Sequence, residues 1–239
     1  MPKKPCYILF ADKWLSTRMR GKMMSRLVRC AYNQNTYNNV YRHERTLTDF
    51  EGVVLKNYLA QLVPSPSILD IGCGSGVPYG QYLVENQCKL TGIDISQAQI
   101  EKAKKNLPAS TTLICGDFLS TRLEPYYDGI VMLYSLYHIH RDQHHAVLSK
   151  LYELLDDEGV ILMNIRTEDA AMKYKDHFCG KPMLWSHYAW PVFSEMLTMH
   201  GFVYDVIGDE KDHGSPESHL WIYITKQKSK SNSTGQCCL

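Results

Sequence analysis

A glycine-rich segment carries the clearest chemistry in the sequence. Asp70-Ile-Gly72-Cys73-Gly74-Ser-Gly76 follows a short apolar run, at the point where a strand should give way to a helix. Glycines at such a turn let the backbone approach a ligand closely. Turns that hold a diphosphate read G-x-G-x-x-G, whereas this one reads G-x-G-x-G and begins with a carboxylate. We therefore expect a ligand with an ammonium group and no diphosphate.

Two further acidic residues follow apolar runs. Asp94 lies 22 residues after Gly72, where a carboxylate can accept hydrogen bonds from both hydroxyls of a ribose. Asp117 ends the next run and is followed by Phe118, an acceptor and an aromatic face suited to a base. Together these positions predict a site for an adenine and a ribose attached to a cationic group.

Histidines and aromatic residues near later strand ends are candidates for the reaction itself. His138 follows a fourth apolar run, and a histidine with a pKa of about 6.5 is a natural base for a hydroxyl, carboxyl or amine nucleophile. A role in helix capping or packing is the alternative. Trp185 and His187, in an expected long loop, are candidates for the substrate pocket. Core packing remains the alternative for these aromatic residues.

The elements that must position these residues alternate along the chain. Strand-like and helix-like patterns predict an α/β, doubly wound, Rossmann-like sheet with right-handed crossovers. The last two strands are separated only by a polar loop and should pair as an antiparallel hairpin. The expected strands are 67–71, 89–94, 112–115, 129–133, 160–165, 202–207 and 220–225.

The two ends of the chain differ from its centre. Residues 1–30 hold eight Lys or Arg and one Asp, and 7–28 have a cationic amphipathic helix pattern. We expect a solvated extra helix in a basic extension, 1–34, with membrane-surface, targeting or RNA contact as alternatives. The catalytic domain should span 35–226. The tail 227–239 should be disordered, and its Cys237-Cys238 pair leaves peripheral membrane contact open.

Composition limits the class of protein. A length of 239 residues with 44% hydrophobic content fits one catalytic domain. The net charge of +1 provides no global attraction for nucleic acid, so we expect no nucleic-acid partner. Eight cysteines without a C-x-x-C pair favour free thiols. Without an apolar run of about 20 residues or a signal peptide, we expect a soluble, cytoplasmic protein.

The motifs resemble those of class I methyltransferases that depend on S-adenosylmethionine. Ile68-Leu-Asp-Ile-Gly-Cys-Gly-Ser-Gly looks like their first motif, Thr91-Gly-Ile-Asp-Ile-Ser their second and Cys115-Gly-Asp-Phe their third. The resemblance implies a seven-stranded sheet with the last strand antiparallel beside the fifth, preceded by N-terminal helices. It also implies cofactor contacts at Asp70, Gly72, Cys73, Gly74, Gly76, Asp94, Ile95, Asp117, Phe118, Leu133 and Tyr134.

Two segments narrow the resemblance. Residues 134–141 and 182–188 are similar to a small-molecule, ubiquinone-biosynthesis-like (type 11) group, in which Tyr37 and Tyr41 would belong to a lid over the cofactor and acceptor. Leu133-Tyr134-Ser-Leu stands where enzymes that methylate the exocyclic amines of nucleic-acid bases carry Asn/Asp-Pro-Pro-Tyr. It also stands where catechol-type enzymes carry acidic metal ligands.

The expected function is transfer of a methyl group from S-adenosylmethionine to an oxygen or nitrogen atom of a small molecule, without a metal. In-line displacement would depend mainly on positioning. Asp157 and Glu158 depart from the usual "L-x-P-G-G" turn, which leaves open a cofactor-binding protein without catalysis that acts as an interaction partner. An RNA or protein methyltransferase guided by the basic N-terminus is the third hypothesis.

Overall fold

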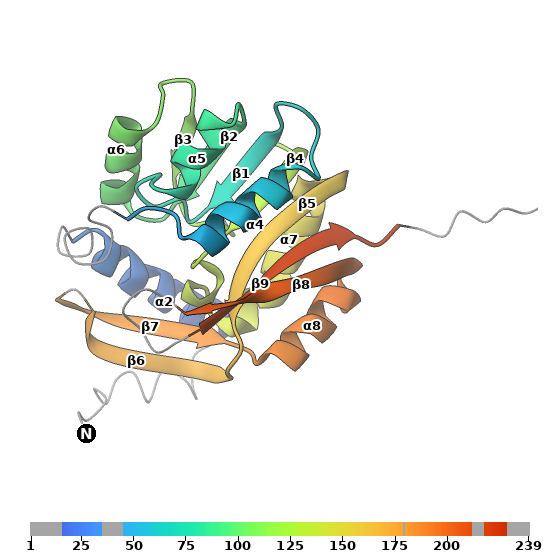
Figure 1. The fold of residues 1–239 in the computed structure, drawn as a ribbon. Helices are drawn as coiled ribbons and strands as arrows, with labels where there is room; N and C mark the ends of the chain where they lie inside the picture. The colour runs from blue at the N-terminus through green and yellow to red at the C-terminus, as the bar shows by residue number, and fades with distance from the viewer. Residues whose placement is uncertain (1–15, 35–44, 179, 212–217, 229–239) are drawn as a thin grey trace, which may run out of the picture.

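A twisted mixed sheet forms the centre of the molecule (Figure 1). The structure is a computed structural model that describes residues 16–34, 45–178, 180–211 and 218–228. In the described part, the sheet has seven strands in the order β3-β2-β1-β4-β5-β9-β8. The strands are β1 (Ser67–Ile71), β2 (Lys89–Asp94), β3 (Thr112–Cys115), β4 (Tyr127–Met132), β5 (Leu155–Arg166), β8 (Phe202–Lys211) and β9 (Ser218–Lys226).

Strand direction confirms the fold expected from the sequence. β1 to β5 pair in parallel, whereas β9 pairs antiparallel with both β5 and β8. β1, β4 and β5 are buried along most of their length because helices cover both of their faces, whereas the edge strand β3 is partly exposed. The strand order reverses at β1, which lies between β2 and β4. Ligands of open α/β sheets bind at such a reversal, beyond the carboxyl ends of the strands.

Helices on the two faces of the sheet complete two apolar cores. One face is covered by α7 (His144–Leu154) and α8 (Trp190–Met199), and the other by α4 (Asp49–Leu59), α5 (Tyr79–Glu85) and α6 (Gln97–Asn106). Thr48 and Glu51 form a reciprocal capping box at the start of α4. Ser96 caps α6 by accepting a hydrogen bond from the Gln99 amide, and Ser followed three residues later by Gln is a sequence pattern of helix starts.

The segment after β5 is a hairpin, so the prediction of a long loop was wrong. β6 (Ala170–Phe178) and β7 (Lys181–His187) pair antiparallel as a separate two-stranded sheet (Figure 1). Lys173 and Lys175 are exposed, while Tyr174 between them is half-buried. This alternation is a strand signal, although the hairpin needs a partner to cover its apolar side.

Helix α2 (Thr17–Tyr32) supplies that partner. Its Met24, Val28 and Ala31 are buried in a third apolar cluster with Leu184 and Trp185 of β7. The prediction of a solvated helix in a separate extension was therefore wrong, because one face of α2 packs on the domain. The helix begins at Thr17, after the Ser16 cap. The expected earlier turns, the Tyr37 and Tyr41 lid, and the tail after 228 lie outside the described residues.

Candidate active site

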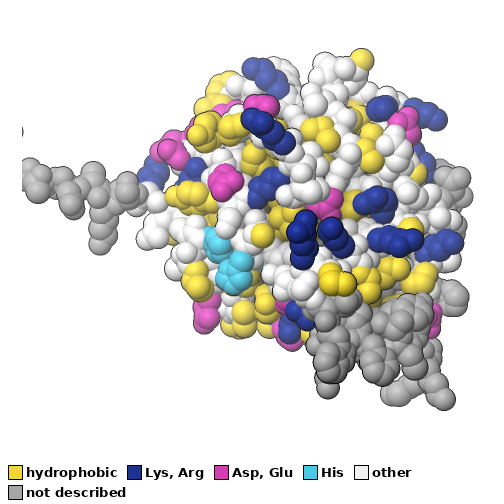
Figure 2. Space-filling model, turned by 180° about the vertical axis from the view of Figure 1, so that it is seen from behind, with side chains coloured by type: hydrophobic (Ala, Val, Ile, Leu, Met, Phe, Trp, Pro, Cys, Tyr) yellow, Lys and Arg dark blue, Asp and Glu magenta, His cyan; other side chains and the backbone are white. Residues whose placement is uncertain are grey.

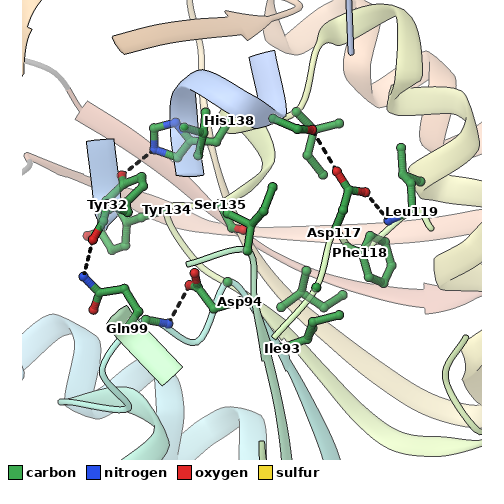
Figure 3. A pocket seen from close by; sticks show the side chains of 18 of the residues that line it. Tyr32, Ile93, Asp94, Gln99, Asp117, Phe118, Leu119, Tyr134, Ser135 and His138 are labelled. Carbon is green, nitrogen blue, oxygen red and sulfur yellow. Dashed lines mark hydrogen bonds between the residues drawn. The ribbon is translucent and has the colours of Figure 1, made fainter. Parts of the chain in front are cut away.

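A cavity lies beyond the carboxyl ends of β1, β2 and β4, and α2 borders it (Figure 3). Its empty volume is about 880 Å³, part of which is open to solvent. The strand ends contribute Gly72, Asp94 and Tyr134, and α2 contributes Ser25, Val28 and Tyr32. The cavity thus occupies the reversal of strand order and includes an element that the sequence placed outside the catalytic domain.

The glycine turn forms the floor of this cavity. Gly72 and Gly74 have φ angles of +81° and +55°, in the left-handed region that favours glycine. A Cβ atom on Gly72 would lie 2.2 Å from Ser135 Oγ, so the turn and the loop after β4 touch. At Gly74 the nearest atom to an added Cβ is Gln99 Oε1 at 3.9 Å. The open space there allows a ligand to approach the backbone, as the sequence predicts.

Three residues predicted to contact a cofactor do not line the cavity. Gly76 has a packing role, because an added Cβ would lie 2.7 Å from Leu107 at the end of α6. The Cys73 amide donates to the Ile93 carbonyl at 3.1 Å, and burial raises the pKa of its thiol. Asp70 is buried below the turn. The other predicted contacts line the cavity: Gly72, Gly74, Asp94, Ile95, Asp117, Phe118, Leu133 and Tyr134.

The two aspartates at the cavity already bind protein groups. Asp94 accepts hydrogen bonds from the amides of Gly74 and Ser96, at 2.9 and 2.8 Å, and so joins the glycine turn to the cap of α6. Asp117 accepts from the Ser25 hydroxyl of α2 at 2.8 Å, and its other oxygen accepts from the Leu119 amide at 3.0 Å. Both carboxylates face the cavity with fixed orientations.

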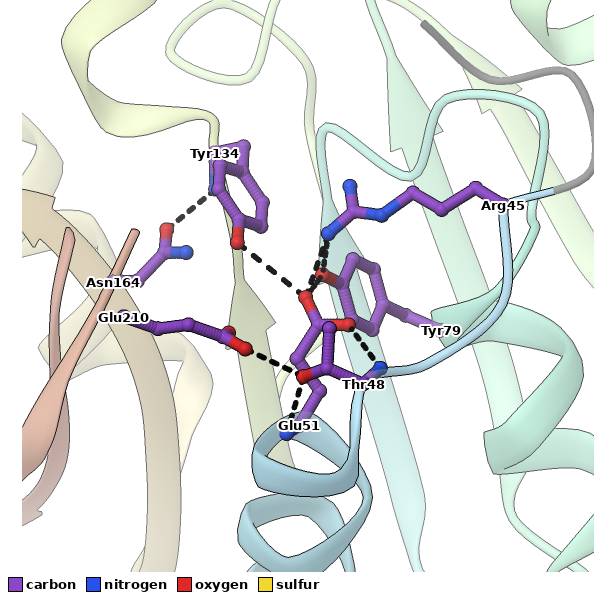
Figure 4. A network of polar contacts seen from close by, with 7 residues as sticks. All are labelled: Arg45, Thr48, Glu51, Tyr79, Tyr134, Asn164 and Glu210. Carbon is purple, nitrogen blue, oxygen red and sulfur yellow. Dashed lines mark hydrogen bonds and ion pairs between the residues drawn. The ribbon is translucent and has the colours of Figure 1, made fainter. Parts of the chain in front are cut away.

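Tyr134 is held in an uncommon backbone conformation. Its φ angle is +54°, which non-glycine residues adopt rarely and often at functional sites. Its amide donates to Oδ1 of the fully buried Asn164 at 2.6 Å (Figure 4). Its ring stacks on Tyr79, with 6.3 Å between centroids, and the Arg45 guanidinium lies 5.0 Å from its centroid.

A buried ion pair supports these rings (Figure 4). Glu51 is fully buried and lies 2.6 Å from the Arg45 guanidinium, and it also accepts a hydrogen bond from the Tyr79 hydroxyl. The Thr48 amide donates to its second oxygen at 3.0 Å. Sequence reasoning missed this network. The spacing Thr48-x-x-Glu51 was its visible signal, because it is the capping-box pattern.

His138 lines the cavity and shares a hydrogen bond with Tyr32. Its Nε2 lies 2.7 Å from the Tyr32 hydroxyl oxygen, and the two rings meet edge to face (Figure 3). Burial, followed by the positive charge of Arg166, lowers the pKa of His138 to about 3. The expectation of a base with a pKa near 6.5 was therefore wrong. The imidazole is neutral at physiological pH.

The predicted substrate-pocket residues lie elsewhere. Trp185 is buried in the third apolar cluster, where its ring packs against Phe178 at 5.5 Å, so the packing alternative holds. His187 Nδ1 hydrogen-bonds the Glu168 carbonyl at 2.7 Å, and its ring borders a smaller cavity with His144. Neither residue lines the large cavity. Tyr37 and Tyr41 lie outside the described residues.

The described residues include neither a cluster of metal-ligating side chains nor a helix that could span a membrane. In the ranges 16–34, 45–178, 180–211 and 218–228, His, Cys, Asp and Glu side chains form no group of three or more arranged for a metal ion. No helix in this described portion has the length and apolar character that crossing a membrane requires.

The chain is similar in sequence to known methyltransferases. Residues 68–159 match the family model described as "Methyltransferase domain". A sphingolipid C9-methyltransferase A of Emericella nidulans is 27% identical over 151 residues, which is 60% of this chain and 29% of that protein. An uncharacterized methyltransferase of Bacillus cereus is 28% identical over 126 residues, 53% of this chain and 55% of that protein. The chain thus spans about half or less of these relatives.

Solved structures share the fold at low sequence identity. The magnesium protoporphyrin IX methyltransferase of Synechocystis, with bound S-adenosylhomocysteine, has a TM-score of 0.64 and 17% identity, covering 85% of this chain and all of that one. The 1,6-didemethyltoxoflavin-N1-methyltransferase of Burkholderia thailandensis, with 1,6-didemethyltoxoflavin and S-adenosylhomocysteine bound, has a TM-score of 0.63 and 16% identity. The alignment covers 95% of this chain and 93% of that one.

Proposed function

From the premise that this chain carries a class I, S-adenosylmethionine-dependent methyltransferase domain, we propose that it methylates an oxygen or nitrogen atom of a small molecule. The observation that carries the proposal is the cavity in which the open glycine turn meets the carboxylates of Asp94 and Asp117. The two solved relatives named above act on small molecules, which supports this class of acceptor. RNA or protein substrates remain the alternative.

The residues present fit the cofactor. Asp94 would accept hydrogen bonds from ribose hydroxyls, and Asp117 with the ring of Phe118 would receive the adenine. The open face of Gly74, with nothing closer than 3.9 Å to an added Cβ, would admit the part of the molecule next to the sulfonium. When bound, S-adenosylmethionine supplies an electrophilic methyl group on a good leaving group. The chain has to orient the acceptor and handle its proton.

Tyr32 and His138 are the groups we assign to the acceptor. Because the His138 imidazole is neutral, its Nε2 can accept the hydrogen bond of the Tyr32 hydroxyl at 2.7 Å. The phenol oxygen then keeps its lone pairs for an O–H or N–H donor in the cavity. His138 is then a positioning residue that orients Tyr32, and the methyl acceptor would hydrogen-bond to the Tyr32 hydroxyl oxygen.

Transfer of a labelled methyl group tests the function. The full chain is incubated with S-adenosylmethionine labelled on its methyl group and with metabolite, RNA and protein fractions of a cell extract. We expect label in the metabolite fraction. Label in RNA or protein would replace the proposed acceptor class, and cofactor binding without transfer to any fraction would favour the binding protein that lacks catalysis. Asp94→Ala, which we expect to bind the cofactor more weakly, should transfer less label than the unchanged chain.

A further inference from the structure

The outer face of α2 carries a row of cations. Arg18, Lys22, Arg26 and Arg29 are exposed and follow one another at intervals of four, four and three residues, so they share one side of the helix. The helix contains no acidic residue. Figure 2 shows Lys and Arg side chains gathered on the rear face of the molecule.

Apolar side chains run beside this row. Met19 is 53% exposed, and Met23 and Leu27, at successive intervals of four residues, are half-buried. In Figure 2 hydrophobic side chains lie next to the Lys and Arg side chains. A helix that presents cations above a band of partly exposed Met and Leu has the composition of helices that lie in the interface of a bilayer.

Neighbouring elements carry further exposed cations. The hairpin β6–β7, whose β7 packs along α2, adds exposed Lys173, Lys175 and Lys181. At the other end of α2, burial raises the pKa of the Cys115 thiol, and the positive charges of Arg29 and Lys104 both oppose this shift. These two cations therefore lie near the same group. Nearby carboxylates are partly engaged: Asp142 pairs with Arg20, Glu101 with Lys104, and Asp176 accepts from the Tyr174 hydroxyl.

We propose that this face of α2 and the β6–β7 hairpin docks on an anionic lipid bilayer. The cations would meet lipid phosphates and carboxylates, while Met19, Met23 and Leu27 would enter the boundary of the acyl region. The apolar band favours a bilayer over RNA, because single-stranded RNA is bound through stacking aromatic rings and this row contains none. The inner side of the same helix borders the cavity through Val28 and Tyr32, so docking places the cavity at the membrane surface.

Co-sedimentation of the full chain with lipid vesicles tests the proposal. Vesicles of phosphatidylcholine alone are compared with phosphatidylserine-rich vesicles, at low and high salt. Each Lys or Arg near an anionic surface strengthens binding about fivefold. We expect binding to phosphatidylserine vesicles that is at least tenfold stronger, that weakens with salt, and that falls to the phosphatidylcholine level in the triple variant Arg18→Glu/Lys22→Glu/Arg26→Glu.

A matched variant separates the row from net charge. Lys56→Glu/Lys89→Glu/Arg122→Glu changes the same number of exposed cations elsewhere and should keep vesicle binding. Circular dichroism verifies that both triple variants are folded, and Met19→Ser should lower the binding that persists at high salt. Equal loss in both triple variants, no preference for phosphatidylserine, or tighter binding to RNA than to vesicles would overturn the proposal. Methyl transfer is not measured, so the result is independent of the proposed reaction.

Discussion

At the scale of single residues, the protonation of His138 makes the stability of the fold depend on pH. His138 has a folded pKa of about 3 because it is buried and lies near Arg166, whereas an unfolded histidine titrates near 6.5. Between these values the unfolded chain binds more protons than the folded one. Stability is therefore fully present above pH 6.5 and is lost as the pH falls toward 3.

This difference predicts an acid sensitivity that depends on His138. Lowering the pH from 6.5 to 5 should reduce the free energy of unfolding by roughly 2 kcal/mol through this group. His138→Gln should lose that part of the decline in urea titrations, whereas the exposed His145→Gln should keep it. The rate of methyl transfer should show no limb near pH 6.5 that disappears in His138→Gln. Such a limb would restore His138 as a free base.

Asp94 is the residue on which cofactor affinity should depend most directly. Asp94→Ala removes a charged acceptor from the cavity and also the bonds to the Gly74 and Ser96 amides. Binding of S-adenosylmethionine should weaken roughly 10- to 100-fold, since a hydrogen bond to a charged group contributes about 1.5 to 3 kcal/mol. Calorimetric titration measures the change. Asp205→Ala, on an exposed position of β8, is the control, and equal affinity in both variants would refute the assignment.

At the scale of elements, α2 is not a separate extension, because it forms part of the wall of the cavity. Its polar links to the rest of the molecule include Ser25 to Asp117, Tyr32 to His138 and Arg20 to Asp142, and its C-cap Asn33 bonds Ser96. Its buried face also covers the apolar side of β7. A separate extension could be removed without harm, whereas removal of residues 1–28 should expose Leu184 and Trp185 and open the cavity.

A pair of methionines on α2 tests this role. Met24 is fully buried, whereas Met19 is 53% exposed. Met24→Ala should cost about 2 to 5 kcal/mol of stability, as buried large-to-small substitutions do, and should weaken cofactor binding. Met19→Ala should change either quantity little. Thermal unfolding and calorimetry measure both, and matching behaviour of the two variants would show that the packing of α2 is unimportant.

The start of α4 carries a second element-scale prediction. Glu51 compensates the charge of Arg45 and accepts from the Tyr79 hydroxyl in a fully buried position. Glu51→Gln removes one partner of a buried ion pair, which costs about 3 to 5 kcal/mol. Chemical denaturation should show this loss. The exposed Glu101→Gln, which breaks only a surface pair with Lys104, should change stability little.

The whole molecule explains why residues from distant segments share one site. The strand order reverses at β1, so the loops after β1 and β4 meet, as the approach of Gly72 to Ser135 shows. Tyr32 and His138 are 106 positions apart in the chain and still share a hydrogen bond. Packing of α2 against β7 and against the segment that follows β4 brings them together.

The sequence by itself determined the sheet and the side of the cavity that the glycine turn, Asp94 and Asp117 form. Local patterns were sufficient there: apolar runs of strand length, glycines at a turn, and Asp94 and Asp117 after successive strands, since parallel strands deliver their carboxyl ends to one edge. The capping of α6 by Ser96 was equally local. These features survive because each depends on residues close together in the chain or on the fixed handedness of the crossovers.

Tertiary structure decided the side of the cavity that α2 and His138 form. The sequence does not show which segment covers the apolar side of α2 or of the β6–β7 hairpin. It therefore predicted a solvated helix and a loop, whereas in the structure the two elements cover each other. The neutral state of His138 also depends on long-range burial, which local sequence does not encode. Gly76 shows the converse case, because its motif position suggested a ligand contact while packing against Leu107 accounts for the glycine.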